Sequence, residues 1–334
     1  MTVDWLVAAD DRTGALEVAA EIASVTGGSV PVVVHPSMRA GAVVDLGSRR
    51  CTRDDAAARA TSVEDVQVVW TAHKIDSTLR GNWVDELRAR QSVSGRRVLL
   101  IAAWPAMGRT CVDGVVHVHG ERHGDLRDHV AGVGVLRSDD EVRRWLDEPV
   151  DHGWAACDVI DSDQMRRLAS LVAQHDDVMP AAPAGPIGAV FAARLGLVSR
   201  QRGCALQQPA LVVCGSATEV AAAQVAELRR LRPDIPVIAA TRAGGGELDP
   251  MIAEEIAAEG RRRAAATGCR TVVVVGGDTA AAFLGSDERR VGGTVLPGLP
   301  WSTGTDDHVV VVTKAGAFGS ADTLVRLFEE EDAG

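Results

Sequence analysis

The sequence predicts an α/β protein of two domains, each a mainly parallel sheet flanked by helices, with the active site in the cleft between them. Short apolar runs alternate with helix-like stretches, as in parallel sheets. Each run is continuously apolar, as expected for strands that are covered on both faces. The pattern stops near residue 176 and starts again near residue 209, so we expect domains at residues 1–200 and 209–334.

In the first half, the apolar runs predict four strands, at residues 5–9, 30–34, 66–70 and 98–102. A helix is expected at residues 15–24. Residues 176–188 contain Pro180, Pro183 and Pro186. Because proline removes a backbone donor and fixes φ, this stretch is predicted to be a loop, followed by a helix at residues 189–197. The polar residues 200–208 are predicted to link the domains.

The second half repeats the strand and helix pattern. Strands are predicted at residues 210–214, 237–240, 271–275 and 309–313. Helices are predicted at residues 219–230, 250–267 and 320–330. The run at 271–275 consists of β-branched residues only and is the strongest strand signal of the chain.

Composition excludes several classes of function. The net charge is −11, the sequence pI is about 5.3 and no basic stripe is present, which argues against nucleic acid and anionic membranes as partners. The N-terminus lacks a signal-peptide pattern, and no apolar run approaches the roughly 20 residues of a membrane span. None of the six cysteines forms a CxxC pair, which indicates free thiols in a cytoplasmic protein. The sequence leaves open whether the chain forms homo-oligomers.

Polar turns follow the strands of the first half, where the carboxyl ends of parallel strands form a ligand crevice. Asp10 and Asp11 follow the first strand and are candidates to bind substrate hydroxyls or to act as general base; alternatively, one of them caps the next helix. Lys74 and Arg80 are candidates to hold a carboxylate. A solvated loop with an internal ion pair explains their charges equally well. Arg109 is a further candidate anion binder.

The second half carries glycine turns at three strand ends. These are Gly215-Ser216, Gly276-Gly277-Asp278-Thr279, and the stretch from Lys314 through Gly316 to Gly319. Glycines let backbone N–H groups approach phosphate oxygens, and a helix N-terminus favours negative charge. GxxxxGK[ST] and GxGxxG are both absent, so the chain is neither a P-loop NTPase nor a carrier of the dinucleotide fingerprint. His117, His119 and His123 are interpreted as exposed histidines, and no metal site is expected.

Taken in order, these motifs resemble those of the four-carbon acid sugar kinases, once a domain family of unknown function. The matching strings are Ala-Asp-Asp-x-Thr-Gly-Ala (9–15), Lys-Ile-Asp-Ser-Thr-Leu-Arg-Gly (74–81), Gly-Arg-Thr-x-x-x-Gly (108–114), Gly-Gly-Asp-Thr-Ala (276–280), Pro-Gly-Leu-Pro-Trp (297–301) and Lys-x-Gly-x-Phe-Gly (314–319). The resemblance implies an N-terminal acid-sugar-binding domain and a C-terminal nucleotide-binding domain. It also implies phosphorylation by ATP of a hydroxyl on an acid such as threonate, erythronate or a 3-oxo-tetronate.

The resemblance also assigns residues. It implies that the acid is bound by Asp10, Asp11, Lys74, Asp76, Ser77, Arg80 and Arg109, and ATP by Ser216, Gly276, Gly277, Asp278, Thr279, Gly316 and Gly319. In the mechanism that we expect, Mg²⁺ would bridge the phosphates, and Lys314 or backbone amides would stabilise the transferring γ-phosphoryl group. Asp11 or Asp10 would orient or deprotonate the attacking hydroxyl.

The chain departs from the family pattern in three places. Arg12 replaces the usual apolar residue between Asp-Asp and Thr-Gly, and the segment between Val34 and Lys74 is short. Residues 182–193 only loosely resemble the glycine-and-serine turn that the family has there. Two other functions remain as alternatives, a dinucleotide-dependent oxidoreductase and a non-catalytic acid-sugar sensor. The missing GxGxxG counts against the first. The presence of motifs for both ligands counts against the second.

Overall fold

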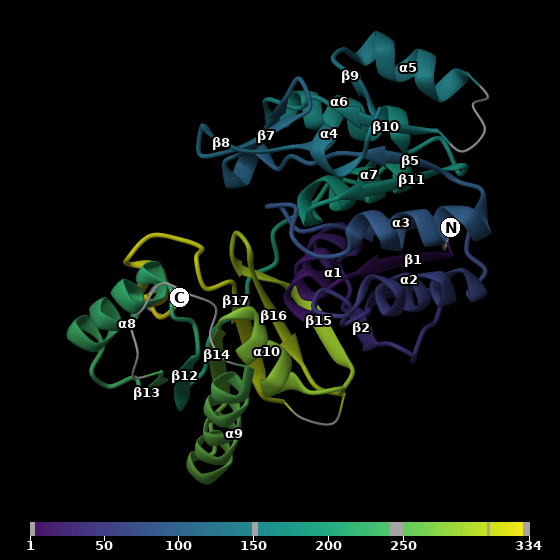
Figure 1. The fold of residues 1–334 in the computed structure, drawn as a ribbon. Coiled ribbons are helices and arrows are strands. Elements are labelled where there is room, and N and C mark those ends of the chain that lie inside the picture. The colour runs from purple at the N-terminus through teal and green to yellow at the C-terminus, as the bar shows by residue number, and fades with distance from the viewer. Residues whose placement is uncertain (1–3, 149–152, 241–249, 306–307, 330–334) are drawn as a thin grey trace. The chain divides into compact units, whose positions relative to one another are not determined.

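The computed structural model describes residues 4–148, 153–240, 250–305 and 308–329 (Figure 1). Contacts between Cα atoms divide the chain into two compact units, Met1–Arg200 and Gln201–Gly334, called unit 1 and unit 2 below. Each unit has its own set of strands with helices packed against them, so the chain is a mainly parallel α/β protein, as the sequence predicts.

The main sheet of unit 1 is entirely parallel, in the order β2-β3-β1-β4-β11-β5-β10-β9. Its strands are β1 (Trp5–Ala9), β2 (Val30–Val34), β3 (Ala42–Asp45), β4 (Trp70–Lys74), β5 (Arg97–Leu100), β9 (Gly134–Leu136), β10 (Trp154–Cys157) and β11 (Val178–Ala182). Ala9, the last residue of β1, pairs with Asp45 on one side and with Lys74 on the other. The carboxyl ends of β1, β3 and β4 therefore lie level at one edge of the sheet.

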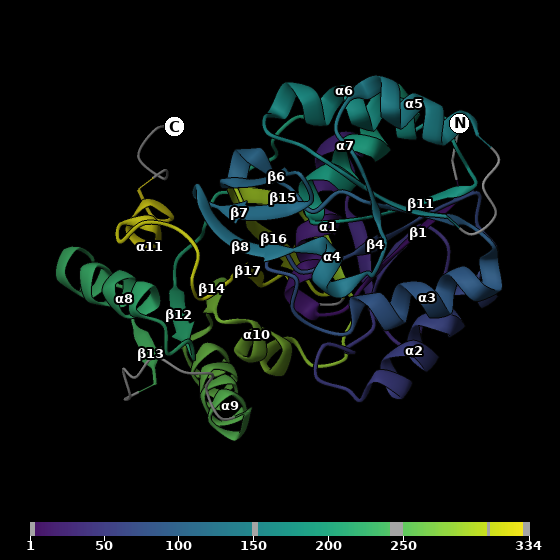
Figure 2. The ribbon, with the colours of Figure 1, turned by 45° about the horizontal axis from the view of Figure 1, so that its top comes forward.

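Helices cover this sheet on both sides. They are α1 (Arg12–Thr26), α2 (Arg53–Ser62), α3 (Trp83–Ser94), α4 (Leu126–His129), α5 (Asp139–Asp147), α6 (Ser162–Val172) and α7 (Ala184–Leu195). Figure 2 shows α6 and α7 on one side of the strands and α2 and α3 on the other. A separate antiparallel sheet consists of β6 (Arg109–Val112), β7 (Val115–Val118) and β8 (Glu121–Asp125).

Two predictions for unit 1 are wrong. The strand expected at residues 66–70 begins only at Trp70, because β4 pairs with β1 from Trp5 onward. Its polar residues Thr71 and His73 are buried, and their partners lie on neighbouring elements: the backbone of β1 and Arg90 for Thr71, and Glu86 of α3 for His73. These partners allow a strand without a continuous apolar run.

The predicted loop at residues 176–188 contains the strand β11 and the start of α7. Pro180 lies in a strand between β4 and β5, yet pairing with β4 begins only at Ala181, after the proline. Pro186 lies in the first turn of α7, where helices tolerate the missing N–H. Prolines in these positions do not break the elements that contain them.

Unit 2 has a sheet in the order β13-β12-β14-β17-β16-β15. The parallel strands are β12 (Ala210–Cys214), β13 (Val237–Ala239), β14 (Thr271–Val275) and β17 (Val310–Lys314), which confirms the four predicted strands. The antiparallel strands β15 (Arg289–Leu296) and β16 (Leu299–Thr303) were not predicted, because Gly292, Gly293 and Pro300 interrupt the strand pattern.

The helices of unit 2 are α8 (Glu219–Leu231), α9 (Pro250–Thr267), α10 (Gly277–Leu284) and α11 (Thr323–Arg326). The first two match the prediction closely. The closing helix is shorter than the predicted 320–330, and Glu330 lies outside the described residues. Among the described helices, none has the length and apolar character to cross a membrane.

Candidate active site

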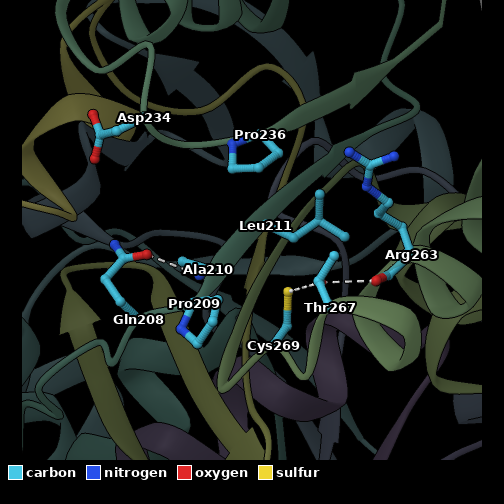
Figure 3. A pocket seen from close by; sticks show the side chains of 9 residues that line it. All are labelled: Gln208, Pro209, Ala210, Leu211, Asp234, Pro236, Arg263, Thr267 and Cys269. Carbon is cyan, nitrogen blue, oxygen red and sulfur yellow. Dashed lines mark hydrogen bonds between the residues drawn. The ribbon is translucent and has the colours of Figure 1, made fainter.

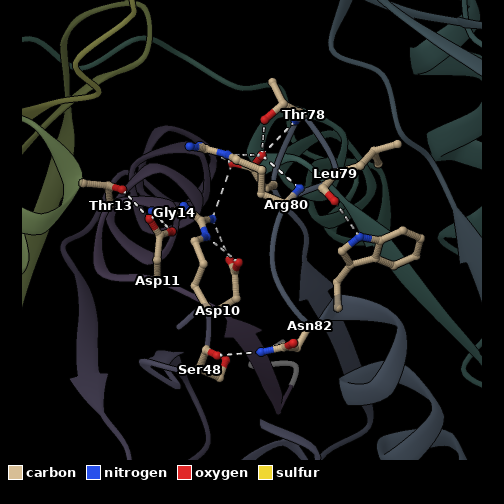
Figure 4. A network of polar contacts seen from close by, with 12 residues as sticks. Asp10, Asp11, Thr13, Gly14, Ser48, Thr78, Leu79, Arg80 and Asn82 are labelled. Carbon is tan, nitrogen blue, oxygen red and sulfur yellow. Dashed lines mark hydrogen bonds and ion pairs between the residues drawn. The ribbon is translucent and has the colours of Figure 1, made fainter. Parts of the chain in front are cut away.

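The predicted acid-binding residues of unit 1 meet at the carboxyl ends of β1 and β4 (Figure 4). Asp10 and Asp11 directly follow β1, Lys74 ends β4, and Asp76 follows it. Asp10, Lys74 and Asp76 are buried, and Asp11 is half-buried. The strand register therefore brings together the two motifs, which are more than sixty residues apart in the sequence.

Arg49 joins the three aspartates, and the sequence analysis missed it. Its Nε and Nη2 donate to the two carboxylate oxygens of Asp10 at 2.7 and 2.9 Å, and its Nη1 donates to Asp11 at 2.7 Å. Nη2 also lies 3.5 Å from an oxygen of Asp76. The loop after β3 holds Arg49 in place, because the N–H groups of Ser48 and Arg49 donate to the carbonyl of Asp10. A bidentate pair of this kind is a strong and directional contact.

Asp11 also caps α1, so the capping alternative is confirmed for this residue. Its carboxylate accepts hydrogen bonds from the N–H of Gly14 at 2.8 Å and from the hydroxyl of Thr13 at 2.7 Å. Although burial opposes it, the charges of Arg49 and Lys74 hold the pKa of Asp11 below its usual value. A Cβ on Gly14 would lie 2.6 Å from Oδ1 of Asp11 and 2.8 Å from Nζ of Lys74, so a larger residue here would force these two side chains to shift.

The segment after β4 folds around Asp76. Its carboxylate accepts hydrogen bonds from the N–H and hydroxyl of Thr78, and from Nε and Nη2 of Arg80 at 3.1 and 3.0 Å. The loop thus contains the internal ion pair that the sequence left open, while 62% of the Arg80 side chain remains exposed. Ser77 is half-buried beside it. Burial acts to raise the pKa of Asp76, but the hydrogen bond from Arg80 and the charge of Arg49 outweigh it and hold this pKa far below its usual range.

Two more groups of unit 1 lie within electrostatic reach of this cluster. Arg109, at the start of β6, donates to the carbonyl of Met107; burial lowers the pKa of its guanidinium, while Glu17 and Asp76 raise it. Glu17 of α1 lies among the charges of Lys74, Asp11, Asp76 and Arg49, and burial raises its pKa to about 7. The sequence analysis missed Glu17, although its position three residues after Gly14 places it on the same helix face.

Arg12, the departure from the family pattern, is buried in the first turn of α1. Burial raises the pKa of Asp45 at the end of β3 to about 6, and the charge of Arg12 opposes that rise. Arg12 therefore lies beside the same edge of the sheet as the aspartate cluster.

In unit 2 the three predicted glycine turns pack against one another. A Cβ on Gly316 would lie 2.1 Å from Oγ of Ser216, and a Cβ on Gly215 would lie 2.0 Å from Oγ1 of Thr279. Gly276 has a φ of 112° and its Cβ position is 3.3 Å from the N–H nitrogen of Ser216. The turns after β12, β14 and β17 therefore form one glycine-lined surface at the carboxyl edge of this sheet.

Helix α10 begins directly on this surface. Gly276 is its N-cap, Gly277 is its first residue, and the half-buried Asp278 lies in its first turn. Thr218 caps α8 and donates to the carbonyl of Gly316 at 3.1 Å, which ties the first turn to the third. Gly319 has a φ of 88° and packs against Thr323. Two helix N-termini thus point to the surface, an arrangement that suits phosphate oxygens.

Lys314, the last residue of β17, is buried at the start of the third glycine turn. Its side chain is 1% exposed, and Nζ donates to the carbonyls of Ala315 at 2.8 Å and Gly316 at 3.3 Å. Burial lowers the pKa of Lys314 to about 8, and Cys214 opposes that shift. Of the three N–H donors of the ammonium group, two hold the backbone of the glycine turn, so the geometry favours a positioning role.

Among the residues that the structure describes, one cavity lies at each end of the strands of unit 2. The larger, of about 280 Å³, lies at the amino ends of the strands beside Gln208, Pro236 and Cys269 (Figure 3). The smaller, of about 140 Å³, lies next to Ser216 at the carboxyl ends. It is lined by Cys214, Ser216, Ala217, Ala222, Val225, Ala226, Arg229, Ala239 and Ala240. Because ligands of open α/β sheets bind at the carboxyl ends, the smaller cavity is the one associated with the glycine turns.

The histidines of the small sheet of unit 1 contact the backbone. His117 lies 3.1 Å from the carbonyl of Val115, and His123 lies 3.1 Å from that of Thr78. Within the described part of the chain, no group of three or more His, Cys, Asp or Glu side chains is arranged to hold a metal ion.

Comparison with known families matches both halves of the chain. A family model described as a sugar-binding N-terminal domain matches residues 5–133, and one described as a nucleotide-binding C-terminal domain matches residues 242–324. A D-threonate kinase of Cupriavidus necator is 36% identical over 132 residues, which are 36% of this chain and 31% of the relative. A D-threonate kinase of Salmonella typhimurium is 27% identical, with 96% of each chain covered.

Solved structures share the fold. A Salmonella typhimurium protein described as a candidate tRNA synthase superposes with a TM-score of 0.75 at 19% identity, covering 99% of each chain. A Haemophilus influenzae protein from domain-of-unknown-function family 1537 gives a TM-score of 0.68 at 19% identity, covering 98% of this chain and 99% of its own. The two family models together span more than half of the sequence. The chain belongs to the four-carbon acid sugar kinase family.

Proposed function

We propose that this protein transfers the γ-phosphoryl group of ATP to a hydroxyl of a four-carbon sugar acid, with D-threonate as the first candidate. One observation carries the proposal. The charged cluster around Lys74 lies inside the sugar-binding match, and the glycine turns at Gly276 and Gly316 lie inside the nucleotide-binding match. The names of the relatives support D-threonate as the acid.

Unit 1 would hold the acid. Lys74, Arg80 and Arg109 supply positive charge for its carboxylate, since guanidinium and ammonium groups bind carboxylates through charge-assisted hydrogen bonds. The carboxylates of Asp10, Asp11 and Asp76, together with the Ser77 hydroxyl, would accept hydrogen bonds from its hydroxyls. Arg49 fixes the aspartates before the acid arrives, because it contacts all three. Such preorganisation reduces the entropy lost on binding.

Unit 2 would hold the nucleotide. Backbone N–H groups at Gly276, Gly277 and Gly316–Gly319 would contact the phosphates, with Ser216, Asp278 and Thr279 at the same turns. The small cavity beside Ser216 is lined mainly by alanine and valine and would accept the base of the nucleotide. Mg²⁺ usually binds through substrate phosphates and one or two carboxylates, so we place it on the phosphates of ATP.

The reaction demands little covalent chemistry from the protein. Phosphoryl transfer depends mainly on positioning and on stabilising the charge of the transferring group. Lys314 would contribute by holding the Gly316 turn in shape, as its two backbone hydrogen bonds indicate. Mg²⁺ neutralises phosphate charge when it is bound.

The test is ADP release from ATP and Mg²⁺ with a panel of D- and L-threonate, erythronate, 3-oxo-tetronates and longer aldonates. Release that depends on one four-carbon acid is the expected result. Stabilisation by an acid and by ATP without ADP release from any acid would favour the non-catalytic sensor. An absorbance change at 340 nm with NAD(P) and an acid would favour the oxidoreductase. Either result would contradict the proposal.

A further inference from the structure

Each aspartate of the acid-binding cluster already has partners within unit 1. Asp10 accepts two N–H groups of Arg49. Asp11 accepts hydrogen bonds from Arg49, Thr13 and the backbone of Gly14. For Asp11 these contacts stabilise the ionised form, so it is a weak base although burial opposes the lowered pKa. Burial raises the pKa of Asp10 to about 7, but its side chain is fully buried and Arg49 holds both carboxylate oxygens, so Asp10 presents no oxygen to a substrate hydroxyl.

Asp76 is held in the same way. Its carboxylate accepts hydrogen bonds from Thr78 and Arg80, and Arg49 lies 3.5 Å away. These contacts hold its pKa far below the usual range, so at neutral pH it has little tendency to take up a proton. None of the three aspartates is therefore well suited to deprotonate a substrate hydroxyl.

Glu17 is the exception at this edge of the sheet. It is half-buried in α1, three residues after Gly14, whose Cβ position lies 2.8 Å from Nζ of Lys74. Its charged surroundings come from several elements: Asp11 and Glu21 at α1, Lys74 and Asp76 at β4, Arg49 after β3, and Arg109 on β6. In contrast to the aspartates, its carboxylate makes no hydrogen bond or ion pair with any residue that the structure describes.

We propose that Glu17 is the general base of the transfer reaction and that the three aspartates and Arg49 position the acid. This inference rests on the proposed kinase function. In the step, the substrate hydroxyl oxygen forms a bond to the γ-phosphorus while the bond from that phosphorus to the bridging oxygen of ADP breaks. The hydroxyl proton passes to the carboxylate of Glu17, and ADP leaves with the bond electrons. Glu17 then releases the proton to solvent.

The environment of Glu17 suits this role. Burial raises its pKa to about 7, Lys74 opposes the rise, and the charges of Asp11 and Asp76 add to it. A general base works best when its pKa lies near the operating pH. Because only the ionised carboxylate accepts the proton, kcat should fall as the pH drops below about 7.

Glu21 provides a matched control. It lies one turn further along α1, packs against Gly188 of α7, and has a pKa that burial and the Glu17 charge also raise to about 7. The neighbouring charge that acts on Glu21 is that of Glu17. Glu21→Gln therefore removes a similar carboxyl group from the same helix without touching the cluster.

The experiment measures the pH dependence of ADP release by the full-length wild type, Glu17→Gln and Glu21→Gln with the acid that the wild type uses. We expect Glu17→Gln to lower kcat by about 10²–10⁴-fold, the usual contribution of a general base. The decline of kcat below neutral pH should become much shallower in this variant, with the remainder due to Asp10, whose pKa is also about 7. The Kd values for ATP and for the acid and the Tm should stay near those of the wild type. Glu21→Gln should keep both kcat and the decline.

Several outcomes would overturn the assignment. A Glu17→Gln enzyme with wild-type kcat and an intact acidic decline would show that Glu17 takes up no proton in the step. A variant that keeps kcat but binds the acid much more weakly would make Glu17 a binding residue. If wild type itself releases no ADP with any acid, the proposed function fails together with the assignment, and this outcome is recognised before any variant is made.

Discussion

Replacing Arg49 with methionine should destabilise unit 1 strongly, although Arg49 lies in a loop. Its guanidinium is 21% exposed and makes two hydrogen bonds, of 2.7 and 2.9 Å, to Asp10, which is fully buried. Removal of one partner of a buried pair costs about 3–5 kcal/mol, because it leaves an uncompensated charge. Since Lys74 stays near Asp10, we expect the lower end, about 3 kcal/mol.

The loss of folding stability in Arg49→Met should be larger at high pH than at low pH. Burial raises the pKa of Asp10 to about 7 although Arg49 opposes it, so the loss of Arg49 should raise this pKa further. A carboxyl group with a raised folded-state pKa binds more protons when folded, so its contribution to stability falls as the pH rises through that range. The difference between the variant and the wild type should therefore be smaller at pH 5 than at pH 8.

Urea unfolding followed by tryptophan fluorescence suits this test, because only Trp301 among the seven tryptophans lies in unit 2. The control is Arg53→Met, whose side chain is 82% exposed and 3.8 Å from Asp85. We expect this control to stay within about 0.5 kcal/mol of the wild type. The double variant Asp10→Asn/Arg49→Met should recover part of the loss. Equal stability of Arg49→Met and Arg53→Met at pH 8 would refute the reasoning.

Three further predictions concern nucleotide binding, each measured by calorimetric titration with an ATP analogue. Lys314→Met should weaken binding about tenfold, or about 1.4 kcal/mol, because the Gly316 turn loses two hydrogen bonds; unchanged affinity would exclude the positioning role. Gly316→Ala should weaken it more, since its Cβ would overlap a side chain 2.1 Å away, whereas Gly203→Ala meets no atom within 4 Å and should bind normally. Ala222→Trp should fill the small cavity and lower affinity, whereas Ala223→Trp, exposed on the same helix but outside the lining, should not.

The sequence predicts the four parallel strands of unit 2 well, because their burial requires continuous apolar residues, but it does not predict the antiparallel strands β15 and β16. β14 consists of threonine and valine only, and both of its neighbours pair with it along its whole length. In unit 1 the same rule fails where polar side chains find buried partners. β4 contains Thr71, His73 and Lys74, and the buried Arg90 of α3 donates to Thr71 and to the carbonyl of Ala72. The residues of β4 alone do not show that an arginine from α3 will supply these hydrogen bonds, so the strand could not be predicted from them.

The residues of the candidate site also differ in how far the sequence predicts them. Asp10, Asp11, Lys74 and Asp76 could be predicted because each belongs to a short polar motif at a strand end. Arg49 could not, because β3 was not recognised and the arginine meets Asp10 across 39 residues of sequence. Glu17 lies inside α1. The helical period predicts which face of the helix carries it, but it does not predict that its carboxylate has no hydrogen-bond partner among the described residues. That feature appears only when the partners of the neighbouring aspartates are known.

The central claim is that unit 1 binds the acid and unit 2 binds the nucleotide, and hydrogen–deuterium exchange of the full chain tests it most directly. D-threonate alone should slow exchange at residues 9–15 and 74–82. A non-hydrolysable ATP analogue with Mg²⁺ should slow it at residues 214–219, 276–280 and 314–319. Protection of the unit 1 segments by the nucleotide, or of the unit 2 turns by the acid alone, would contradict the account.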